Sequence, residues 1–287
     1  MDSLPLQKVD LHCHSTVSDG TLTPSQIVEL AKRKGISYFA LTDHDTVSGL
    51  KEAISRGRET GVNVIPGIEV TADTSFLGEG RRELHILGYY FDPESKAIKQ
   101  LTEFFRNSRV KRNRELCGRL EELGYPINYE DMVNRYGENF GKPNIAKALM
   151  DSGYYLDREA AIDFLSSLGV KREKMDYREV FSLIREAGGI PVVAHPVSMK
   201  LRYSELFCFL KKAKEEGLGG VEVYHYKHRS MDVRVLKRMA EELSLHITGG
   251  SDFHGENKPC IELGFLNLRV SDVTLLETHL PSRRKVE

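Results

Sequence analysis

Two histidines stand one residue apart in Val9-Asp10-Leu11-His12-Cys13-His14, a short segment near the start of the chain. Successive side chains of a β-strand point to opposite faces, so residues i and i+2 lie on the same side. If the segment is a strand, His12 and His14 can bind one metal ion together. Cys13 then faces the other way, as a small buried thiol. The segment therefore predicts a metal site at a strand end.

Four further segments place a histidine or a carboxylate in a similar setting. They are Thr42-Asp43-His44-Asp45, Gly67-Ile68-Glu69, Ala194-His195-Pro196 and Gly250-Ser251-Asp252-Phe253-His254. Any one of them alone could be a helix cap or a strand end. Helix capping, however, does not explain why a histidine follows several successive strands. Imidazole and carboxylate ligands from separate strand ends suit Zn, Mn or Fe. Together the segments predict a hydrolase with several metal ions.

Strand-like and helix-like segments alternate in two parts of the chain. The first part predicts strands at 9–14, 36–42, 62–65 and 84–90, with helices between Thr23 and Gly35 and at 47–60. The second part predicts strands at 190–194, 220–224 and 246–249, with helices at 177–187, 203–216 and 230–243. Repeated βα units imply a parallel sheet, an α/β fold and a closed or nearly closed barrel. Barrel enzymes of this kind assemble their sites at the carboxyl ends of the strands, where most of these ligands lie. His85 is the exception, because it precedes its apolar run.

The alternation stops between residues 95 and 176, where the pattern is helical and rich in charge. We therefore expect a barrel domain of residues 1–94 and 177–287, interrupted by a helical insertion of residues 95–176. Basic residues outnumber acidic ones at 100–119. They could attract a phosphate, although a charged helix is more often a solvated face.

The bulk composition limits the kinds of partner. Lys and Arg number 41 against 42 for Asp and Glu, which gives a net charge of −1 and no whole-chain field favouring nucleic acid or a membrane. The four cysteines are scattered, as expected for reduced thiols. No signal peptide and no apolar run near the ~20 residues of a membrane span is visible. We therefore expect a cytoplasmic enzyme that needs neither a membrane nor an obligatory protein partner.

The chain resembles the PHP (polymerase and histidinol phosphatase) metallo-phosphoesterases. The resemblance rests on segments that follow the family order along nearly the whole chain: residues 10–15, Ser18-Asp19-Gly20, residues 41–45, Pro66-Gly67-Ile68-Glu69, His85-Ile86-Leu87-Gly88, Ala194-His195-Pro196 and Ser251-Asp252-Phe253-His254. It implies a distorted (β/α)7 TIM-like barrel that binds two or three divalent ions of Mn, Zn or Fe. The insertion would cap the substrate site.

The resemblance also implies which residues hold each ion. His12, His14 and Asp252 would hold the first ion, and Glu69 would bridge it to a second ion completed by His85 and His195. Asp19, His44 and His254 would hold a third ion, with Asp19 standing where many members have a histidine. Glu69 and Asp19 would thereby take part in catalysis. Ligand imidazoles usually give their second N–H to a carboxylate or carbonyl, and we expect Asp10 and Asp43 to be such acceptors.

The Ser18-Asp19-Gly20 form resembles the nucleotide-phosphatase branch of the family. This implies a nucleoside 3′,5′-bisphosphate that loses its 3′-phosphate, or a nucleoside monophosphate, with attack by a metal-bridging hydroxide. The residues expected to contact substrate are Arg112, Lys142, Asn144, Glu222 and His228. His228 could also donate a proton to the leaving oxygen, or could be an ordinary loop histidine. Lys142 and Asn144 depart from a branch pattern that commonly reads Gly-Arg-Pro-His, which leaves the exact substrate open.

Three other functions stay open at this point. A histidinol-phosphate phosphatase would use the same chemistry, but the Ser18-Asp19-Gly20 form and the insertion weigh against it. A 5′-to-3′ exoribonuclease on short RNA would use the same centre, although no aromatic platform for long strands is evident. An inactive barrel kept as a binding module predicts lost ligands, whereas every matched position carries a competent one. No Gly-rich phosphate loop is visible, which disfavours an ATP-consuming or hydride-transfer enzyme.

Overall fold

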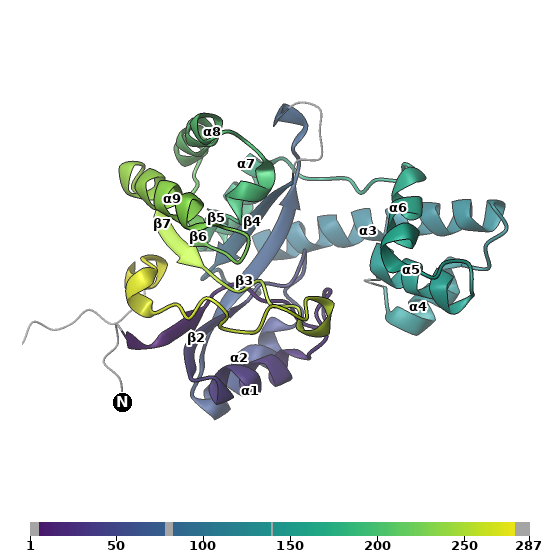
Figure 1. The fold of residues 1–287 in the computed structure, drawn as a ribbon, viewed down its shortest axis with the longest axis horizontal. Helices are drawn as coiled ribbons and strands as arrows, with labels where there is room; N and C mark the ends of the chain where they lie inside the picture. Colours follow the sequence, from purple (N-terminus) through teal and green to yellow (C-terminus); the bar gives the residue numbers. More distant parts are fainter. Residues whose placement is uncertain (1–5, 78–82, 139, 279–287) are drawn as a thin grey trace, which may run out of the picture. The chain divides into compact units, whose positions relative to one another are not determined.

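The computed structural model describes residues 6–77, 83–138 and 140–278. Seven strands form one sheet in the order in which they occur along the chain (Figure 1). The strands are β1 Lys8–Asp10, β2 Ile36–Leu41, β3 Asn63–Ala72, β4 Leu84–Tyr89, β5 Ile190–Val193, β6 Gly220–Tyr224 and β7 His246–Gly249. The predicted α/β class is confirmed.

Five helices accompany the sheet close to their predicted positions. They are α1 Pro24–Arg33, α2 Leu50–Thr60, α7 Tyr177–Glu186, α8 Tyr203–Glu215 and α9 Ser230–Glu242. α1 and α2 pack beside β2 and β3, whereas α7 and α9 pack beside β5 and β6 (Figure 1). The start of α1 follows from local sequence, because Thr23 and Gln26 form a reciprocal capping box.

One strand runs against the others, which corrects the prediction of a parallel sheet. β4 pairs antiparallel with both β3 and β5, and the other neighbouring strands pair parallel. Among the described residues between β3 and β4 no helix of crossover length occurs, and a parallel pair would require such a crossover. The start of β4 therefore lies beside the end of β3, where His85 is paired with Thr71. This direction places His85 at the same edge as the ligands that follow the parallel strands.

β3 is longer than predicted, and this changes the position of Glu69. The strand was expected to end at Ile65, but it continues to Ala72. The extension exists because β4 pairs with residues 67–72 and satisfies their backbone groups. Glu69 therefore projects from within a strand and not from the loop beyond it.

The two ends of the sheet are linked by backbone hydrogen bonds. No β1–β7 ladder is formed by the residues described, but the Leu11 N–H donates to the Gly249 carbonyl (3.2 Å) and the Asp252 N–H to the His12 carbonyl (2.8 Å). Gly250 allows this approach, because a Cβ there would lie 2.3 Å from the His12 nitrogen. The contact brings His12 and Asp252 together from opposite ends of the chain.

Apolar side chains fill the space between the strands. Leu11 and Tyr89 belong to one buried cluster, within which the Tyr89 hydroxyl donates to the Leu11 carbonyl at 2.7 Å. Cys13 is fully buried, and its thiol donates to the Ala40 carbonyl at 3.3 Å. The prediction of a small buried thiol between two histidines is thus confirmed.

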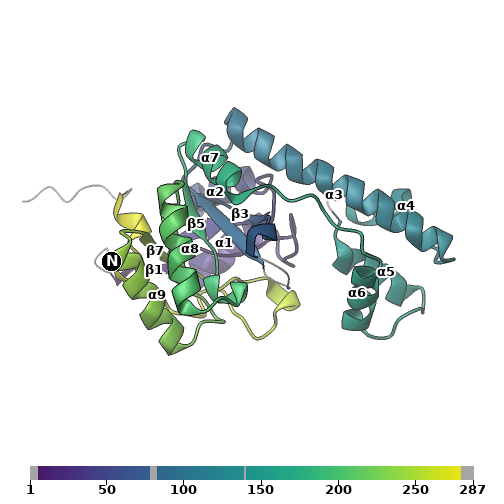
Figure 2. The ribbon, with the colours of Figure 1, turned by 90° about the horizontal axis from the view of Figure 1, so that it is seen from above.

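The chain divides into two compact units. The first comprises residues 1–101 and 175–287, and the second comprises residues 102–174. The helices of the inserted region are α3 Lys96–Glu122, which begins in the first unit, α4 Tyr129–Tyr136, α5 Lys142–Asp151 and α6 Arg158–Ser167 (Figure 2). The second unit has its own apolar core, which includes Leu116, Phe140 and Leu149. Among the residues described, no helix combines the length and the apolar character needed to span a membrane.

Candidate metal centre

Glu69 is the point at which the predicted ligands meet. Its carboxylate is almost fully buried, with 1% of the residue exposed. One oxygen, Oε2, lies 3.3 Å from His12 Nε2, 3.2 Å from His14 Nε2 and 3.2 Å from His44 Nδ1. Asp252 Oδ1 completes this side of the centre, at 3.5 Å from His12 Nε2 and 3.4 Å from His14 Nε2. His12 and His14 share a side as predicted, but they lie beyond β1, which ends at Asp10 and not at the predicted His14.

The other oxygen of Glu69 faces a separate pair of histidines. Oε1 lies 2.9 Å from His85 Nδ1 and 2.9 Å from His195 Nε2. The antiparallel direction of β4 supplies His85, and the end of β5 supplies His195. His195 has a positive φ of 24°, a strained conformation for a residue with a side chain, and its N–H donates to Glu222 Oε2 at 2.7 Å. A carboxylate with three histidines on one oxygen and two different histidines on the other has the geometry of a bridge between two ions.

A third group of ligands lies around Asp19, whose side chain is 45% exposed. Asp19 Oδ1 is 3.3 Å from His254 Nε2, and Oδ2 is 3.9 Å from His44 Nε2. His44 thus has one ring nitrogen toward Glu69 and the other toward Asp19. The loop turns back at Gly20, where a Cβ would lie 2.2 Å from the His14 carbonyl oxygen. All nine predicted ligands therefore converge at one edge of the sheet.

Divalent ions fit these residues. His12 Nε2, both ring nitrogens of His14 and His44 Nδ1 are buried without a hydrogen-bond partner among the described residues. Buried polar atoms are rarely left unpaired, so such nitrogens require an explanation. Four overlapping groups of histidines and carboxylates have ligand atoms within 4.8 Å of one another. Imidazole and carboxylate donors at these spacings are what Zn, Mn and Fe require.

The charges within the centre are strongly coupled. Burial opposes ionisation of Glu69, but His44, His12 and His85 hold the pKa of its carboxyl group well below the usual range. Burial also opposes protonation of His14, yet the neighbouring carboxylates of Asp252 and Glu69 raise its pKa to about 9. Burial lowers the pKa of His44 to about 4. Without bound ions, protons on imidazoles such as His14 therefore balance the carboxylates.

The tautomers of three ligands are set by hydrogen bonds from Nδ1. The Nδ1–H of His12 donates to Glu222 Oε1 (2.8 Å), that of His195 to Ser198 Oγ (2.7 Å), and that of His254 to the Asp252 carbonyl (2.8 Å). Each of these bonds leaves Nε2 with a lone pair directed into the centre. Glu222 is fully buried and has both oxygens engaged, so it orients ligands instead of making the predicted contact with substrate.

Asp10 and Asp43 do not accept imidazole protons as predicted. Asp10 accepts the N–H groups of Ser251 (2.9 Å) and Gly264 (2.7 Å), and thereby ties the first ligand segment to the last. Asp43 accepts the N–H of Ser15 (2.7 Å) and the hydroxyl of Ser18 (2.6 Å). Backbone N–H groups lie closer to these carboxylates than the ring nitrogens do. Both residues therefore shape the ligand loops and do not hold the rings.

The residues predicted to contact substrate fall in both units. Arg112 lies in the second unit, with 6% of the residue exposed. Its burial is the main cause that lowers its pKa to about 10, and the charges of Arg172 and Arg109 lower it further. Burial and Arg112 also lower the pKa of Lys142. Asn144 caps α5, because its Oδ1 accepts the Gly141 N–H at 2.8 Å.

His228 lies in the first unit, in the loop after β6. Its Nδ1–H donates to the Val223 carbonyl at 2.9 Å, which leaves Nε2 as a buried acceptor without a hydrogen-bond partner among the described residues. Burial also lowers its pKa. The neutral ring that this produces is an acceptor at Nε2, so the predicted donation of a proton would first require a second proton on the ring.

His225 is the residue of the centre that sequence reasoning missed. It is buried, and its Nε2 lies 3.2 Å from Asp252 Oδ2. Lys258 was also missed, and its Nζ lies 2.6 Å from the same oxygen. His225 follows β6 directly, in the position that histidine ligands occupy after other strands. That position at a strand end was the signal available in the sequence.

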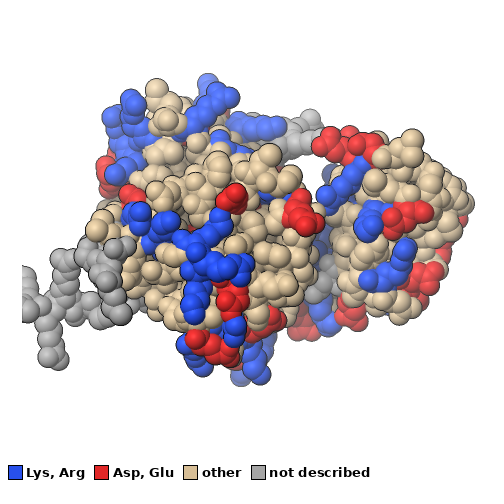
Figure 3. Space-filling view, turned by 60° about the horizontal axis from the view of Figure 1, so that its bottom comes forward, with Lys and Arg blue, Asp and Glu red and all other residues tan. Residues whose placement is uncertain are grey.

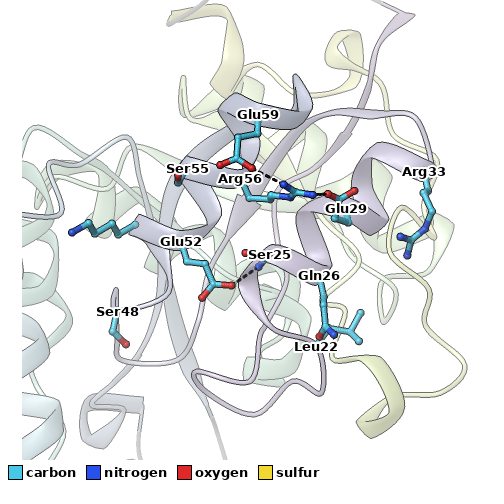
Figure 4. Close-up of a pocket in the computed structure, with 11 residues that line it drawn as sticks. Leu22, Ser25, Gln26, Glu29, Arg33, Ser48, Glu52, Ser55, Arg56 and Glu59 are labelled. Carbon is cyan, nitrogen blue, oxygen red and sulfur yellow. Dashed lines mark hydrogen bonds and ion pairs between the residues drawn. The ribbon is translucent and has the colours of Figure 1, made fainter.

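A surface groove between α1 and α2 lies apart from this chemistry. Figure 4 shows its lining side chains, which include Ser25, Glu52 and Arg56 and none of the predicted metal ligands. The Arg56 guanidinium is paired with Glu29 and Glu59, and Glu52 accepts the Ser25 N–H at 2.9 Å. Acidic and basic side chains are also interspersed over the face shown in Figure 3. The groove is thus a surface on which charges are largely matched.

A seven-stranded α/β sheet with this cluster at one edge defines a metal-dependent hydrolase. The PHP domain model matches residues 10–154 of the chain, and the chain belongs to the PHP family. The predicted family and the predicted class, a metal-dependent phosphoesterase, are thereby confirmed.

Curated relatives extend over most of the chain. A 5′-3′ exoribonuclease of Haemophilus influenzae is 34% identical, with 90% of this chain and 93% of the relative covered. A phosphoribosyl 1,2-cyclic phosphate 1,2-diphosphodiesterase of Eggerthella lenta is 32% identical, with 89% and 97% covered. A 3′,5′-nucleoside bisphosphate phosphatase of Chromobacterium violaceum is 27% identical, with 90% and 91% covered. These relatives share hydrolysis of phosphate esters and differ in the ester.

Among solved structures, a Bifidobacterium adolescentis protein proposed to be a metal-dependent phosphoesterase has the same fold. It superposes with a TM-score of 0.76 at 32% identity and covers 91% of this chain and 92% of its own. The likeness spans both parts of the sheet and the insertion between them.

Proposed function

We propose that this chain hydrolyses the 3′-phosphate ester of a nucleotide that also carries a 5′-phosphate, with a nucleoside 3′,5′-bisphosphate as substrate. The observation that carries the hydrolytic part is the position of Glu69, whose two oxygens face separate groups of histidines, three at Oε2 and two at Oε1. When bound there, two or three ions of Mn, Zn or Fe would lower the pKa of water and neutralise phosphoryl oxygens. Phosphate-ester hydrolysis requires this chemistry.

The residues of the chain prepare the centre for this role. Glu69 bridges the ligand sets, and Asp19 supplies the carboxylate on the exposed side, where a substrate phosphate can arrive. Glu222 and Ser198 fix His12 and His195 in the tautomers that ligation requires. His228 Nε2 offers a lone pair near this edge and can accept a hydrogen bond from substrate. Such an arrangement needs little reorganisation when the reaction begins.

The basic side chains of the second unit form a group that fits an anion. Arg112 is buried beside the like charges of Arg109 and Arg172, and Lys142 feels the charge of Arg112. Arg112 Nε has no hydrogen-bond partner among the described residues. A cation surrounded by other cations is stabilised by an anion, and guanidinium groups bind phosphate well. These residues therefore form, within the second unit, a group that fits a phosphate.

A short 5′-phosphorylated RNA is the second candidate, favoured by the 34% identity to the Haemophilus influenzae exoribonuclease. The two substrates are chemically alike at the reacting end. Both present a nucleoside 5′-phosphate whose 3′-oxygen is esterified to phosphorus, and in both the bond from the 3′-oxygen to phosphorus would break. The centre would act on both if the chain beyond the first nucleotide can be accommodated.

The test is product release from a panel of substrates after reconstitution with Mn²⁺. The panel holds a nucleoside 3′,5′-bisphosphate, a nucleoside monophosphate, histidinol phosphate and a short 5′-phosphorylated RNA. We expect the highest kcat/KM for the bisphosphate, and release of a nucleoside 5′-phosphate. Preference for histidinol phosphate or for the monophosphate would overturn the proposal, and preference for RNA would replace it with the second candidate. Glu69→Gln should abolish the activity, and Glu94→Gln, which changes an exposed glutamate, should keep it.

A further inference from the structure

His225 lies among the metal ligands without being one of the predicted set. It is buried, with 1% of the residue exposed, and its ring centroid lies 6.0 Å from that of His12. Its ligand atoms lie within 4.8 Å of those of His12 and Asp252. Distance alone would make it a further ligand.

The hydrogen bonds of the His225 ring argue against ligation. Its Nδ1 accepts the backbone N–H of Lys227 at 3.2 Å, so Nδ1 carries no proton. A neutral imidazole then has its proton on Nε2, which donates to Asp252 Oδ2 at 3.2 Å. Ligation through Nε2 would require the proton to move to Nδ1, where it would face the Lys227 N–H. Both ring nitrogens are therefore occupied.

The ligand histidines show the opposite arrangement. In His12, His195 and His254 the Nδ1–H donates to an oxygen, and the Nε2 lone pair points into the centre. In His225 the Nε2 proton points at a ligand, and Nδ1 is turned to the backbone. The tautomer thus distinguishes the three ligand histidines, with the proton on Nδ1, from His225, with the proton on Nε2.

The partner of His225 is a ligand held in an unusual conformation. Asp252 has a φ of 55°, a region that side-chain-bearing residues rarely adopt. Its Oδ2 receives the His225 Nε2–H and the Lys258 ammonium, at 3.2 and 2.6 Å. Its Oδ1 faces His12 and His14. The Tyr226 ring lies against His225, with centroids 4.6 Å apart, and limits the rotation of the imidazole.

We propose that His225 is a positioning residue that presents Asp252 to the first ion through Oδ1 alone. With Oδ2 held by His225 and Lys258, the carboxylate is a monodentate ligand and its rotation is blocked. This inference rests on the metal centre and not on the identity of the substrate. It therefore stands or falls on metal binding, whatever ester is hydrolysed.

The first test needs no variant. In the wild-type protein labelled with ¹⁵N, the His225 ring should give the Nε2–H tautomer both before and after loading with diamagnetic Zn²⁺. His12, His195 and His254 should give the Nδ1–H tautomer once loaded. Loss of the Nε2 proton of His225 on loading, or ¹¹³Cd coupling to its ring after Cd²⁺ loading, would show a ligand and overturn the proposal.

The second test uses two substitutions and measures Mn²⁺ affinity and stoichiometry. His225→Leu removes the N–H donor and should weaken the first site by about 10–100-fold, the usual effect of losing the partner of a ligand. His225→Gln keeps an amide N–H near the position of Nε2 and should restore most of the affinity. Equal affinity in both variants and the wild type would overturn the proposal, as would equal loss in both variants when both are folded by circular dichroism.

Discussion

In the first unit, polar side chains from segments far apart in the sequence meet at Glu69. In the second unit, two of the polar side chains predicted to contact substrate instead form hydrogen bonds within their own helix or with a neighbouring helix. Glu69 faces histidines from four different segments, and its neighbours leave ring nitrogens unpaired. Asn144 instead caps its own helix. The Lys142 ammonium donates to Ser166 in the neighbouring helix at 3.2 Å.

The difference distinguishes buried polar side chains that require a ligand from those whose hydrogen bonds are satisfied within the fold. Buried polar atoms that have no partner are costly and persist where a ligand satisfies them. The metal centre has several such atoms, and in the second unit Arg112 Nε is of the same kind. The remaining predicted contacts of the insertion already have partners within the fold.

Glu69→Gln should have the largest effect. The amide keeps one oxygen but loses the charge that two ligand sets share, so bound metal should fall at both. We expect kcat to drop by about 10²–10³-fold or more, as when one main electrostatic group is removed from an active site. Metal content by mass spectrometry and phosphate release measure it. Full activity with full metal content would show that Glu69 is not a bridge.

Glu222→Gln should come next. The amide can no longer take the His12 Nδ1–H as a carboxylate does, so the tautomer that ligation needs is less favoured. Loss of such a partner typically weakens metal binding by about 10–100-fold. Titration with Mn²⁺ followed by calorimetry measures the change. If Glu222 instead contacted substrate as predicted from sequence, KM would rise while metal affinity stayed constant.

Metal binding should release protons at neutral pH. Without ions, carboxylates raise the pKa of His14 to about 9, so this ring is protonated at pH 7. An ion requires the neutral ring, so affinity should rise with pH by up to about tenfold per unit for each proton released, and level off above about pH 9. Calorimetry in buffers of different ionisation enthalpy counts the protons. A pH-independent affinity between 7 and 8.5 would contradict the charge balance described here.

Arg112→Met tests the substrate contact predicted for Arg112 from the sequence. If Arg112 binds the second phosphate, KM for the bisphosphate should rise by about 10-fold or more, because a hydrogen bond to a charged group contributes about 1.5–3 kcal/mol. A nucleoside monophosphate without that group should be hydrolysed as before. Lys147→Met, on an exposed side chain of the same unit, is the matched control. An equal effect on both substrates would make Arg112 structural.

Asn144→Ala should have the smallest effect. It removes the bond that caps α5 and should lower the free energy of unfolding by about 0.5–1.5 kcal/mol. Chemical denaturation measures this change, and kcat/KM at a temperature below unfolding should stay within about twofold of wild type. A large loss of activity without loss of stability would return Asn144 to the substrate site, as the sequence predicted.

Local patterns in the sequence determined the class of site and most of the fold. The i, i+2 spacing of His12 and His14 predicted their shared side, and the βα alternation placed the helices of the first unit and all strands except β1 and β3 close to their observed bounds. Both signals depend on periodicities within a few residues, and these survive folding because each element is built from its own backbone hydrogen bonds. The family motifs then identified nine ligands that the structure brings together.

Only the tertiary structure decided how those ligands are held. β4 pairs antiparallel with β3 and β5, since a parallel β3–β4 pair would require a crossover. This direction explains why His85, at the start of its apolar run, still faces Glu69. Glu222 and His225 acquire their partners from the register of β6 against its neighbours and from the turn that brings Asp252 to His12. Asp10 binds N–H groups from the far end of the chain. These contacts join residues more than a hundred positions apart or on separate strands, and no local pattern encodes such distances.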